Sequence, residues 1–263
     1  MKCQNNYNKL NRKIIKSMKI KIILIALIIL ITIIKLFKSK IKGYIGERLV
    51  SKKLNKLNKR KYKIINNLLL KSPNGSTQID HIVISTHGLF VIETKNYKGI
   101  IKGNEYDENW NQILFRSKEI FRNPIKQNNG HIKVIKDLIP ELRYKKIRSI
   151  ILFTKRAKLK VDTETDVTYY NKVKRVIKSY KNKELTKEEV EFIYETLNKL
   201  NVNSFKERKV HIKNVKRNVK KANKNIKRNR CPRCGAKLKK KRYKYGKFKR
   251  CKNHPQCTFK MNL

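Results

Sequence analysis

A pair of carboxylates and an ammonium group interrupt two neighbouring apolar segments of this chain. Asp80 lies in the segment at 78–84, and Glu93 and Lys95 lie in the segment at 89–95. Both segments are rich in β-branched and aromatic residues, and the short glycine-containing link between them predicts a β-hairpin. Because strand side chains alternate with a period of two, the three charged groups share one face of that hairpin.

The register of this hairpin depends on which two residues form its turn. A turn at 86–87 places Asp80 opposite Glu93, whereas a turn at 87–88 places it opposite Lys95. In both registers the charged groups meet at one end of an otherwise apolar hairpin. Burying charge in such a place is costly, which indicates a functional role.

These groups suit one kind of chemistry. Two nearby carboxylates repel each other, and the repulsion raises one pKa unless a cation intervenes. Carboxylate oxygens are suitable ligands for Mg²⁺ or Mn²⁺, ions that also bind phosphate groups. Lys95 is placed to orient or deprotonate a water molecule, or to stabilise charge on a phosphorus centre. Together they indicate hydrolysis of a phosphodiester; the alternative is a structural ion pair at a sheet edge.

The same residues resemble the D…(D/E)xK signature of restriction-endonuclease-like nucleases and, more closely, the nuclease-related domain (NERD). The matching blocks, between about 43 and 154, are Gly43-Tyr44-Ile45-Gly46-Glu47, Gln78-Ile79-Asp80-His81, Gly88-Leu89-Phe90-Val91-Ile92-Glu93-Thr94-Lys95-Asn96, Trp110, and Asn123-Pro124 with Gln127 and His131. The resemblance implies that Asp80 and Glu93 bind Mg²⁺ or Mn²⁺ and that Lys95 is the catalytic lysine. Glu47 and Gln127 match flanking polar positions of that site.

The elements around these residues predict an α/β fold, and the resemblance implies a restriction-endonuclease-like central mixed sheet flanked by helices. Apolar spacing predicts a helix over 44–57 that carries Glu47, for which a solvated helix charge is the alternative. Strands are expected at 62–70, 147–153 and 167–170.

Two further helices have recognisable starts. Asn123 before Pro124 predicts a helix cap, with a helix that carries Gln127 and runs to about residue 139. The capping-box spacing at 186–189 predicts a second helix that ends near residue 200. Trp110 is interpreted as a packing residue rather than a base-stacking platform, and His131 as a core or surface histidine.

An uncharged run of aliphatic residues lies near the amino terminus, at Ile22–Ile34. It covers about 20 Å as a helix, but flanking lysines that extend their ammonium groups outward allow it to be interpreted as a single transmembrane anchor. A signal peptide and a buried soluble helix are the alternatives. The basic flank that follows the run places the main domain in the cytoplasm, so that the expected location is the cell membrane.

The charge of the chain restricts its partners. Lys and Arg total 69 against 18 Asp and Glu, which gives a formal net charge of +51. An AT-rich genome accounts for part of the lysine content, and the remainder indicates a polyanionic partner, either nucleic acid or an anionic membrane. Residues 203–230 are the most basic stretch, interpreted as a flexible or partly helical linker that is either a solvated spacer or a phosphate- or lipid-binding segment.

Four of the five cysteines are gathered at the carboxyl end of the chain. Cys231 and Cys234 form one close pair, and Cys251 and Cys257 form a second. Such spacing predicts a tetrahedral structural Zn²⁺ site, with His254 as an alternative ligand. The segment resembles the four-cysteine zinc ribbon of bacterial topoisomerases, which implies contact with single-stranded or distorted DNA.

The sequence thus predicts four parts: a basic amino terminus and anchor (1–42), a nuclease-related domain (43–202), a basic linker (203–230) and a zinc ribbon (231–263). The expected function is membrane-anchored, metal-dependent cleavage of DNA, with RNA as a further substrate class. One alternative is a non-catalytic, membrane-tethered DNA-binding protein. Another is a membrane-surface protein whose lysines bind anionic lipid.

Overall fold

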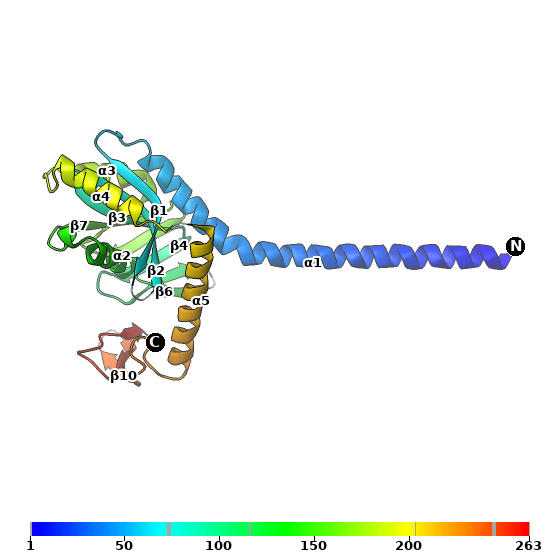
Figure 1. Ribbon diagram of the computed structural model, residues 1–263. Helices are drawn as coiled ribbons and strands as arrows, with labels where there is room; N and C mark the ends of the chain where they lie inside the picture. Colours follow the sequence, from blue (N-terminus) through cyan, green and yellow to red (C-terminus); the bar gives the residue numbers. More distant parts are fainter. Residues whose placement is uncertain (1, 73–74, 116, 203, 244–245, 263) are drawn as a thin grey trace. The chain divides into compact units, whose positions relative to one another are not determined.

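The computed structural model describes residues 2–72, 75–115, 117–202, 204–243 and 246–262 (Figure 1). The chain divides into two compact units, Met1–Ile45 and Gly46–Leu263. One long helix, α1 (Lys2–Leu54), supplies nearly all of the first unit and the beginning of the second.

The transmembrane anchor expected at Ile22–Ile34 is not supported. Within the part of the chain that the structure describes, no helix holds an apolar stretch long enough to cross a membrane. The physical reason is length, because the uncharged run covers about 20 Å of helix and a hydrocarbon core is about 30 Å thick. The expected placement of the main domain in the cytoplasm stays a prediction from flanking charge.

The second unit is built on a five-stranded mixed sheet. Its strands, in the order β1-β2-β3-β7-β9, are β1 (Lys63–Ser72), β2 (Gly75–Ser85), β3 (Gly88–Lys95), β7 (Ile147–Phe153) and β9 (Asp166–Tyr169). The first three pair antiparallel, and β3, β7 and β9 run parallel. This confirms the expected mixed sheet, including the buried strand at 147–153.

Helices cover both faces of this sheet. On one face lie α2 (Pro124–Leu138) and α4 (Lys187–Lys199), whose apolar side chains join those of β1, β2 and β3 in one core cluster. The last turns of α1 and α3 (Val173–Ser179) pack on the other face. Short 3₁₀ turns, η1 (Pro140–Leu142) and η2 (Tyr170–Lys172), precede β7 and α3. The capping box at Thr186 is confirmed at the start of α4.

A smaller sheet, ordered β6-β5-β4-β8, lies beside the main one. Its strands are β4 (Gly99–Asn104), β5 (Asn109–Leu114), β6 (Ser117–Arg122) and β8 (Ala157–Asp162). Trp110 of β5 is fully buried and stacks on Phe153 with ring planes 11° apart. Its interpretation as a packing residue is therefore confirmed.

A buried asparagine ties the smaller sheet to α2. The Asn123 side chain accepts a hydrogen bond from the N–H of Ile125, so the predicted helix cap is confirmed. Its amide nitrogen donates to backbone carbonyls of the 104–107 loop, the shortest contact being 2.8 Å to Asp107. The start of α2 is thereby fixed to the turn between β4 and β5.

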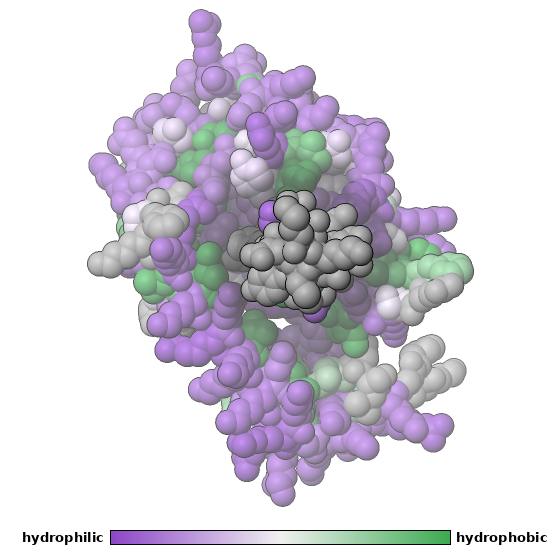
Figure 2. Space-filling model, turned by 90° about the vertical axis from the view of Figure 1, so that its right-hand side faces the viewer, coloured by the Kyte–Doolittle hydropathy of each residue, from purple (hydrophilic) through white to green (hydrophobic). Residues whose placement is uncertain are grey.

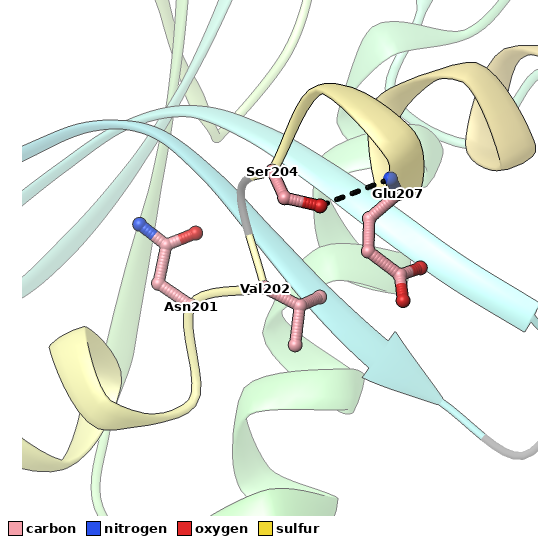
Figure 3. Close-up of a pocket in the computed structure, with 4 residues that line it drawn as sticks. All are labelled: Asn201, Val202, Ser204 and Glu207. Carbon is pink, nitrogen blue, oxygen red and sulfur yellow. Dashed lines mark hydrogen bonds between the residues drawn. The ribbon is translucent and has the colours of Figure 1, made fainter.

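The basic segment after residue 203 forms one continuous helix, α5 (Phe205–Lys227). Its start is held on β1, where the Asn201 side chain accepts from the N–H of Leu69 and the Val202 N–H donates to the Leu69 carbonyl. Ser204 caps the helix by accepting from the N–H of Glu207, beside a small hollow (Figure 3). The segment is thus more ordered than the expected linker.

The chain ends in a small three-stranded antiparallel sheet made of β10 (Leu238–Tyr243), β11 (Gly246–Cys251) and β12 (Lys260–Asn262). Its core contains Leu238 and Phe259 together with cysteines. Phe259 is therefore a packing residue, and the side chains of Tyr243 and Tyr245 lie outside the described residues.

The packing around Trp110 predicts the effect of a single methyl group. A Cβ added at Gly103 would lie 2.2 Å from the Trp110 ring, so Gly103→Ala must displace the indole. We expect a loss of about 1–3 kcal/mol in the free energy of unfolding, measured by urea denaturation. Gly130→Ala in α2 is the control, because no atom lies within 4 Å of its added Cβ. This control should stabilise the protein by about 0.5–1 kcal/mol; equal effects would contradict the packing.

Candidate active site

The β2–β3 hairpin brings the predicted carboxylates together. His81 pairs with Ile92, and Ser85 pairs with Gly88, so the turn is formed by residues 86–87. Continuing this register by one residue places Asp80 opposite Glu93, which is the first of the two registers expected. On the other side of Asp80 the ladder with β1 is interrupted at Asn67, whose φ of 61° is left-handed.

Glu93 is the centre of a compact polar cluster. One carboxylate oxygen, Oε1, lies 2.6 Å from Lys95 Nζ and accepts a hydrogen bond of 2.8 Å from the Gln127 amide. Lys95 in turn donates to Gln127 Oε1 at 2.9 Å. Glu93 and Lys95 are buried, with 4% and 15% of their side chains exposed. Three residues predicted from spacing therefore form one closed network.

The second carboxylate is held by the backbone. Asp80 Oδ2 accepts a 2.8 Å hydrogen bond from the N–H of Thr94. Burial raises the pKa of Asp80 well above its usual range, and the nearby charges of Glu93 and Glu47 add to this effect. Asp80 thus experiences an excess of negative charge that the surrounding protein groups do not neutralise.

Lys95 favours the ionised form of Glu93. Burial alone would raise the pKa of Glu93, but the charges of Lys95 and His131 outweigh it and lower that pKa to about 2. Burial likewise opposes the charged form of Lys95, yet Glu93 raises the lysine pKa above its usual value. The two groups form an ion pair, and Asp80 bears the remaining electrostatic cost.

Glu47 lies near this cluster on the last turns of α1. Burial raises its pKa, and the charge of Glu93 raises it further. The positive charges of Arg208 and Lys95 act in the opposite direction. Glu47 is therefore part of the electrostatic environment of the site, although it is the most peripheral of the predicted residues.

His131 also belongs to the site, where the sequence indicated only a core or surface histidine. It lies one helical turn after Gln127 on α2, with Nε2 at 3.3 Å from Glu93 Oε2. This contact is not aligned as a hydrogen bond. On the other side of the ring, Nδ1 lies 2.6 Å from the hydroxyl of Thr77. The i, i+4 spacing of Gln127 and His131 was the signal that placed them on one face.

Two residues at the edge of the site were missed by sequence reasoning. Arg208 and His211 lie on α5, far along the chain from the carboxylates. His211 Nδ1 lies 2.8 Å from the hydroxyl of Ser76, next to Thr77. Nothing in the local sequence marks these residues, because their position depends on a long-range contact between α5 and β2.

The cluster fits a hard divalent cation. It offers carboxylate oxygens from adjacent strands, the donor type that Mg²⁺ and Mn²⁺ prefer. The raised pKa of Asp80 is the observation that favours a cation, because a positive charge would allow both carboxylates to ionise. Asp80 and Glu93 are the residues that would hold it.

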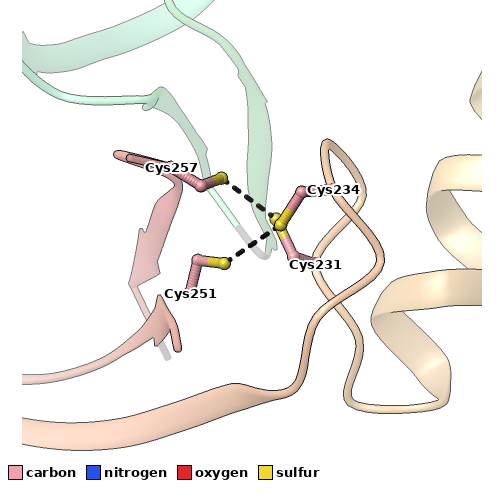
Figure 4. A group of neighbouring side chains, drawn as sticks. All are labelled: Cys231, Cys234, Cys251 and Cys257. Atoms are coloured by element: carbon pink, nitrogen blue, oxygen red, sulfur yellow. Dashed lines mark hydrogen bonds between the residues drawn. The ribbon is translucent and has the colours of Figure 1, made fainter. Parts of the chain in front are cut away.

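The four carboxyl-terminal cysteines form a separate site (Figure 4). Their sulfur atoms all lie within 4.8 Å of one another, and two of the pairs are separated by 3.6 and 3.2 Å. Four thiolates around tetrahedral zinc are about 3.8 Å apart, so the group fits the ion. The N–H of Ala236 lowers the pKa of Cys234 to about 7, which favours a thiolate ligand. His254 is not a member of the group.

Zinc removal should unfold the ribbon and spare the rest of the second unit. The ribbon core is only a few side chains, so the metal is expected to supply most of its folding free energy. A zinc chelator, or Cys234→Ser, should abolish protection of β10 and β11 amides from hydrogen exchange. Amides of β2 and β3 serve as the internal control and should be unchanged. Retained protection in β10 would show that the ribbon folds without metal.

His81, next to Asp80 in sequence, predicts a pH effect on stability. It is buried, its Nδ1 lies 2.7 Å from Asn66 Oδ1, and burial lowers its pKa to about 4. The unfolded state therefore binds the proton more readily below about pH 6.5, and stability is lost as the pH falls toward 4. The loss should reach about 3 kcal/mol in urea denaturation. His81→Leu should flatten this dependence, and an equal slope in both proteins would contradict it.

Comparison with known proteins identifies related sequences. The family model described as nuclease-related domain matches residues 42–154. An uncharacterized protein of Bacillus anthracis is 40% identical over 179 residues, which cover 66% of this chain and 84% of that protein. No solved structure matches the chain. The matched region contains all five residues that were predicted to form the catalytic site.

Proposed function

This chain belongs to the nuclease-related domain family, and we propose from that premise that it hydrolyses phosphodiester bonds in DNA with a divalent cation. The convergence of Asp80, Glu93 and Lys95 at the ends of two adjacent strands carries the proposal. A mixed sheet with helices on both faces also agrees with the restriction-endonuclease-like fold that we infer for this family.

Each residue of the cluster has a distinct task in this proposal. Asp80 and Glu93 hold the cation, which supplies Lewis-acid chemistry at a phosphate when it is bound. The Lys95 ammonium stabilises negative charge that develops on the phosphorus centre and orients the attacking water. Gln127 donates to Glu93 and accepts from Lys95, so it fixes the spacing of the two groups. Their buried position strengthens each of these interactions.

Glu47 and His131 act at the border of the cluster. Glu47 adds negative charge and attracts the cation from the side of α1. His131 contacts Glu93 through one ring nitrogen while the Thr77 hydroxyl fixes the other. We infer that the pair holds the Glu93 carboxylate in one orientation, with Oε1 directed toward Lys95.

The remainder of the chain supplies affinity for DNA. The formal charge of +51 favours a polyanion, and the ribbon carries an exposed basic strand at 239–242. Its four cysteines bind zinc in this proposal, and its likeness to topoisomerase ribbons suggests contact with distorted or single-stranded DNA. Chemistry and affinity would therefore reside in different parts of the second unit.

The test is cleavage of labelled single- and double-stranded DNA by the full-length, zinc-loaded protein with Mg²⁺ or Mn²⁺. Asp80→Asn and Lys95→Met should each lower the cleavage rate by about 10²-fold or more, because each removes a charge used in the transition state. Both changes nearly preserve side-chain volume, so thermal unfolding provides the folding control. Calorimetric titration with Mn²⁺ should show a heat of binding that Asp80→Asn abolishes.

Two outcomes would contradict this proposal. Absence of cleavage with either ion, together with the same Mn²⁺ isotherm in wild type and Asp80→Asn, would leave a non-catalytic DNA-binding protein. Equal cleavage by wild type and Lys95→Met would exclude the role assigned to that lysine. Gln127→Glu is a further comparison, since it retains an acceptor for Lys95 but removes the donor to Glu93.

A further inference from the structure

Helix α5 carries a stripe of lysines along one side. The helix contains ten Lys and Arg residues and a single acid, Glu207. At 100° per residue, six of the lysines fall within an arc of about 80° and recur every three or four positions. This lysine stripe consists of Lys209, Lys213, Lys216, Lys220, Lys224 and Lys227, all exposed.

The stripe is electrostatically unfavourable in the isolated protein. Like charges at i, i+4 destabilise a helix by a few tenths of a kcal/mol per pair. The six lysines extend over about 27 Å at 1.5 Å per residue, and Glu207 is engaged elsewhere, at 3.2 Å from Lys71. An extended polyanion would remove this repulsion along the whole length of the stripe.

One end of α5 borders the candidate active site. His211 contacts Ser76, whose neighbour Thr77 contacts His131, and His131 contacts Glu93. Arg208, one turn before the second lysine of the stripe, acts electrostatically on Glu47. The other end of the helix leads to the ribbon, where a hollow is lined by α5 residues 218–225 and ribbon residues 232–235. Basic groups therefore continue from the carboxylate cluster to the ribbon.

We propose that the lysine stripe of α5 binds the phosphate backbone of a nucleic acid and that Arg208 and His211 guide the bound strand to the carboxylate cluster. Backbone binding does not require turnover, whereas the guiding role rests on the proposed function. The stripe contains only lysines, so its contacts are to phosphates and carry no base sequence. Binding through it is therefore strongly dependent on salt.

A lipid surface fits the helix less well. The apolar side chains that border the stripe are Ile212, Val215 and Val219, each about half exposed. Helices that lie in a membrane surface usually present Trp, Phe or Leu instead. Hydrophilic side chains cover most of the face in Figure 2, with only small apolar areas between them. Charge complementarity thus favours nucleic acid over lipid.

The test compares two quadruple variants of equal charge. One replaces four lysines of the stripe with glutamine, a good helix former: Lys213→Gln, Lys216→Gln, Lys220→Gln and Lys224→Gln. The matched control replaces four exposed lysines near α3 and α4: Lys172→Gln, Lys178→Gln, Lys181→Gln and Lys199→Gln. Both are made in full-length, zinc-loaded protein that also carries Asp80→Asn, so that cleavage cannot interfere.

Fluorescence anisotropy with a labelled DNA duplex gives the dissociation constant from about 50 to about 200 mM salt. Each lost phosphate contact lowers the salt slope by about 0.9, so the stripe variant should lose about 3 to 4 in slope. The control variant should lose less than about 1, since its lysines contribute only to overall charge. Equal slopes for the two variants would overturn the proposal.

Vesicles of phosphatidylglycerol and phosphatidylcholine distinguish the rival partner. If the stripe variant loses vesicle binding while its DNA slope equals that of the control, the stripe binds lipid and the proposal is wrong. Circular dichroism checks that α5 stays helical in both variants. Lys→Arg changes at the same four positions should restore the salt slope.

Guiding is tested separately in protein with Asp80 intact. Arg208→Gln and His211→Gln together should lower the cleavage rate of a long duplex about tenfold and leave its dissociation constant within about twofold. Wild-type cleavage by this variant would exclude the guiding role. If the wild-type protein itself cleaves nothing, the proposed function fails, whereas the comparison of salt slopes still decides the binding surface.

Discussion

The site depends on an electrostatic imbalance between two carboxylates buried at the ends of β2 and β3. Lys95 compensates Glu93, and the result is a low pKa for that carboxyl. Asp80 receives only a backbone N–H and remains subject to burial and to its acidic neighbours, which raises its pKa. A fold that retains such an imbalance gains nothing in stability from it. The unequal treatment of the two acids is understandable as preparation for a positively charged ligand.

The scaffold explains how this imbalance is tolerated. Each of the two core clusters that flank the sheet joins a pair of helices to buried strands, so the ends of β2 and β3 are held by packing on both faces. Gln127 then enters the cluster from α2, a helix whose first turn is itself anchored by buried hydrogen bonds. The polar groups are thus positioned by rigid elements rather than by loops. Such support allows a charged network to keep one geometry.

Sequence reasoning identified the groups whose spacing is local and missed those whose position depends on the tertiary fold. The alternation of Asp80, Glu93 and Lys95 along strands and the close pairs of cysteines are short-range patterns. Arg208 could not be connected with Glu47, because only the docking of α5 brings the two charges near each other. The lysine-rich composition of α5 also concealed its helical order. The apolar run at 22–34 was overinterpreted, since it is too short for the membrane span assigned to it.

The asparagine at the start of α2 links two regions that would otherwise be free to diverge. Its amide joins the loop after β4 to the first turn of the helix that presents Gln127 and His131. Any insertion that shifts this loop would therefore move both side chains relative to Glu93. Among related proteins, we expect loop length here to covary with residues of the hydrolytic centre, so that the accessory sheet evolves as an adjusting device for it.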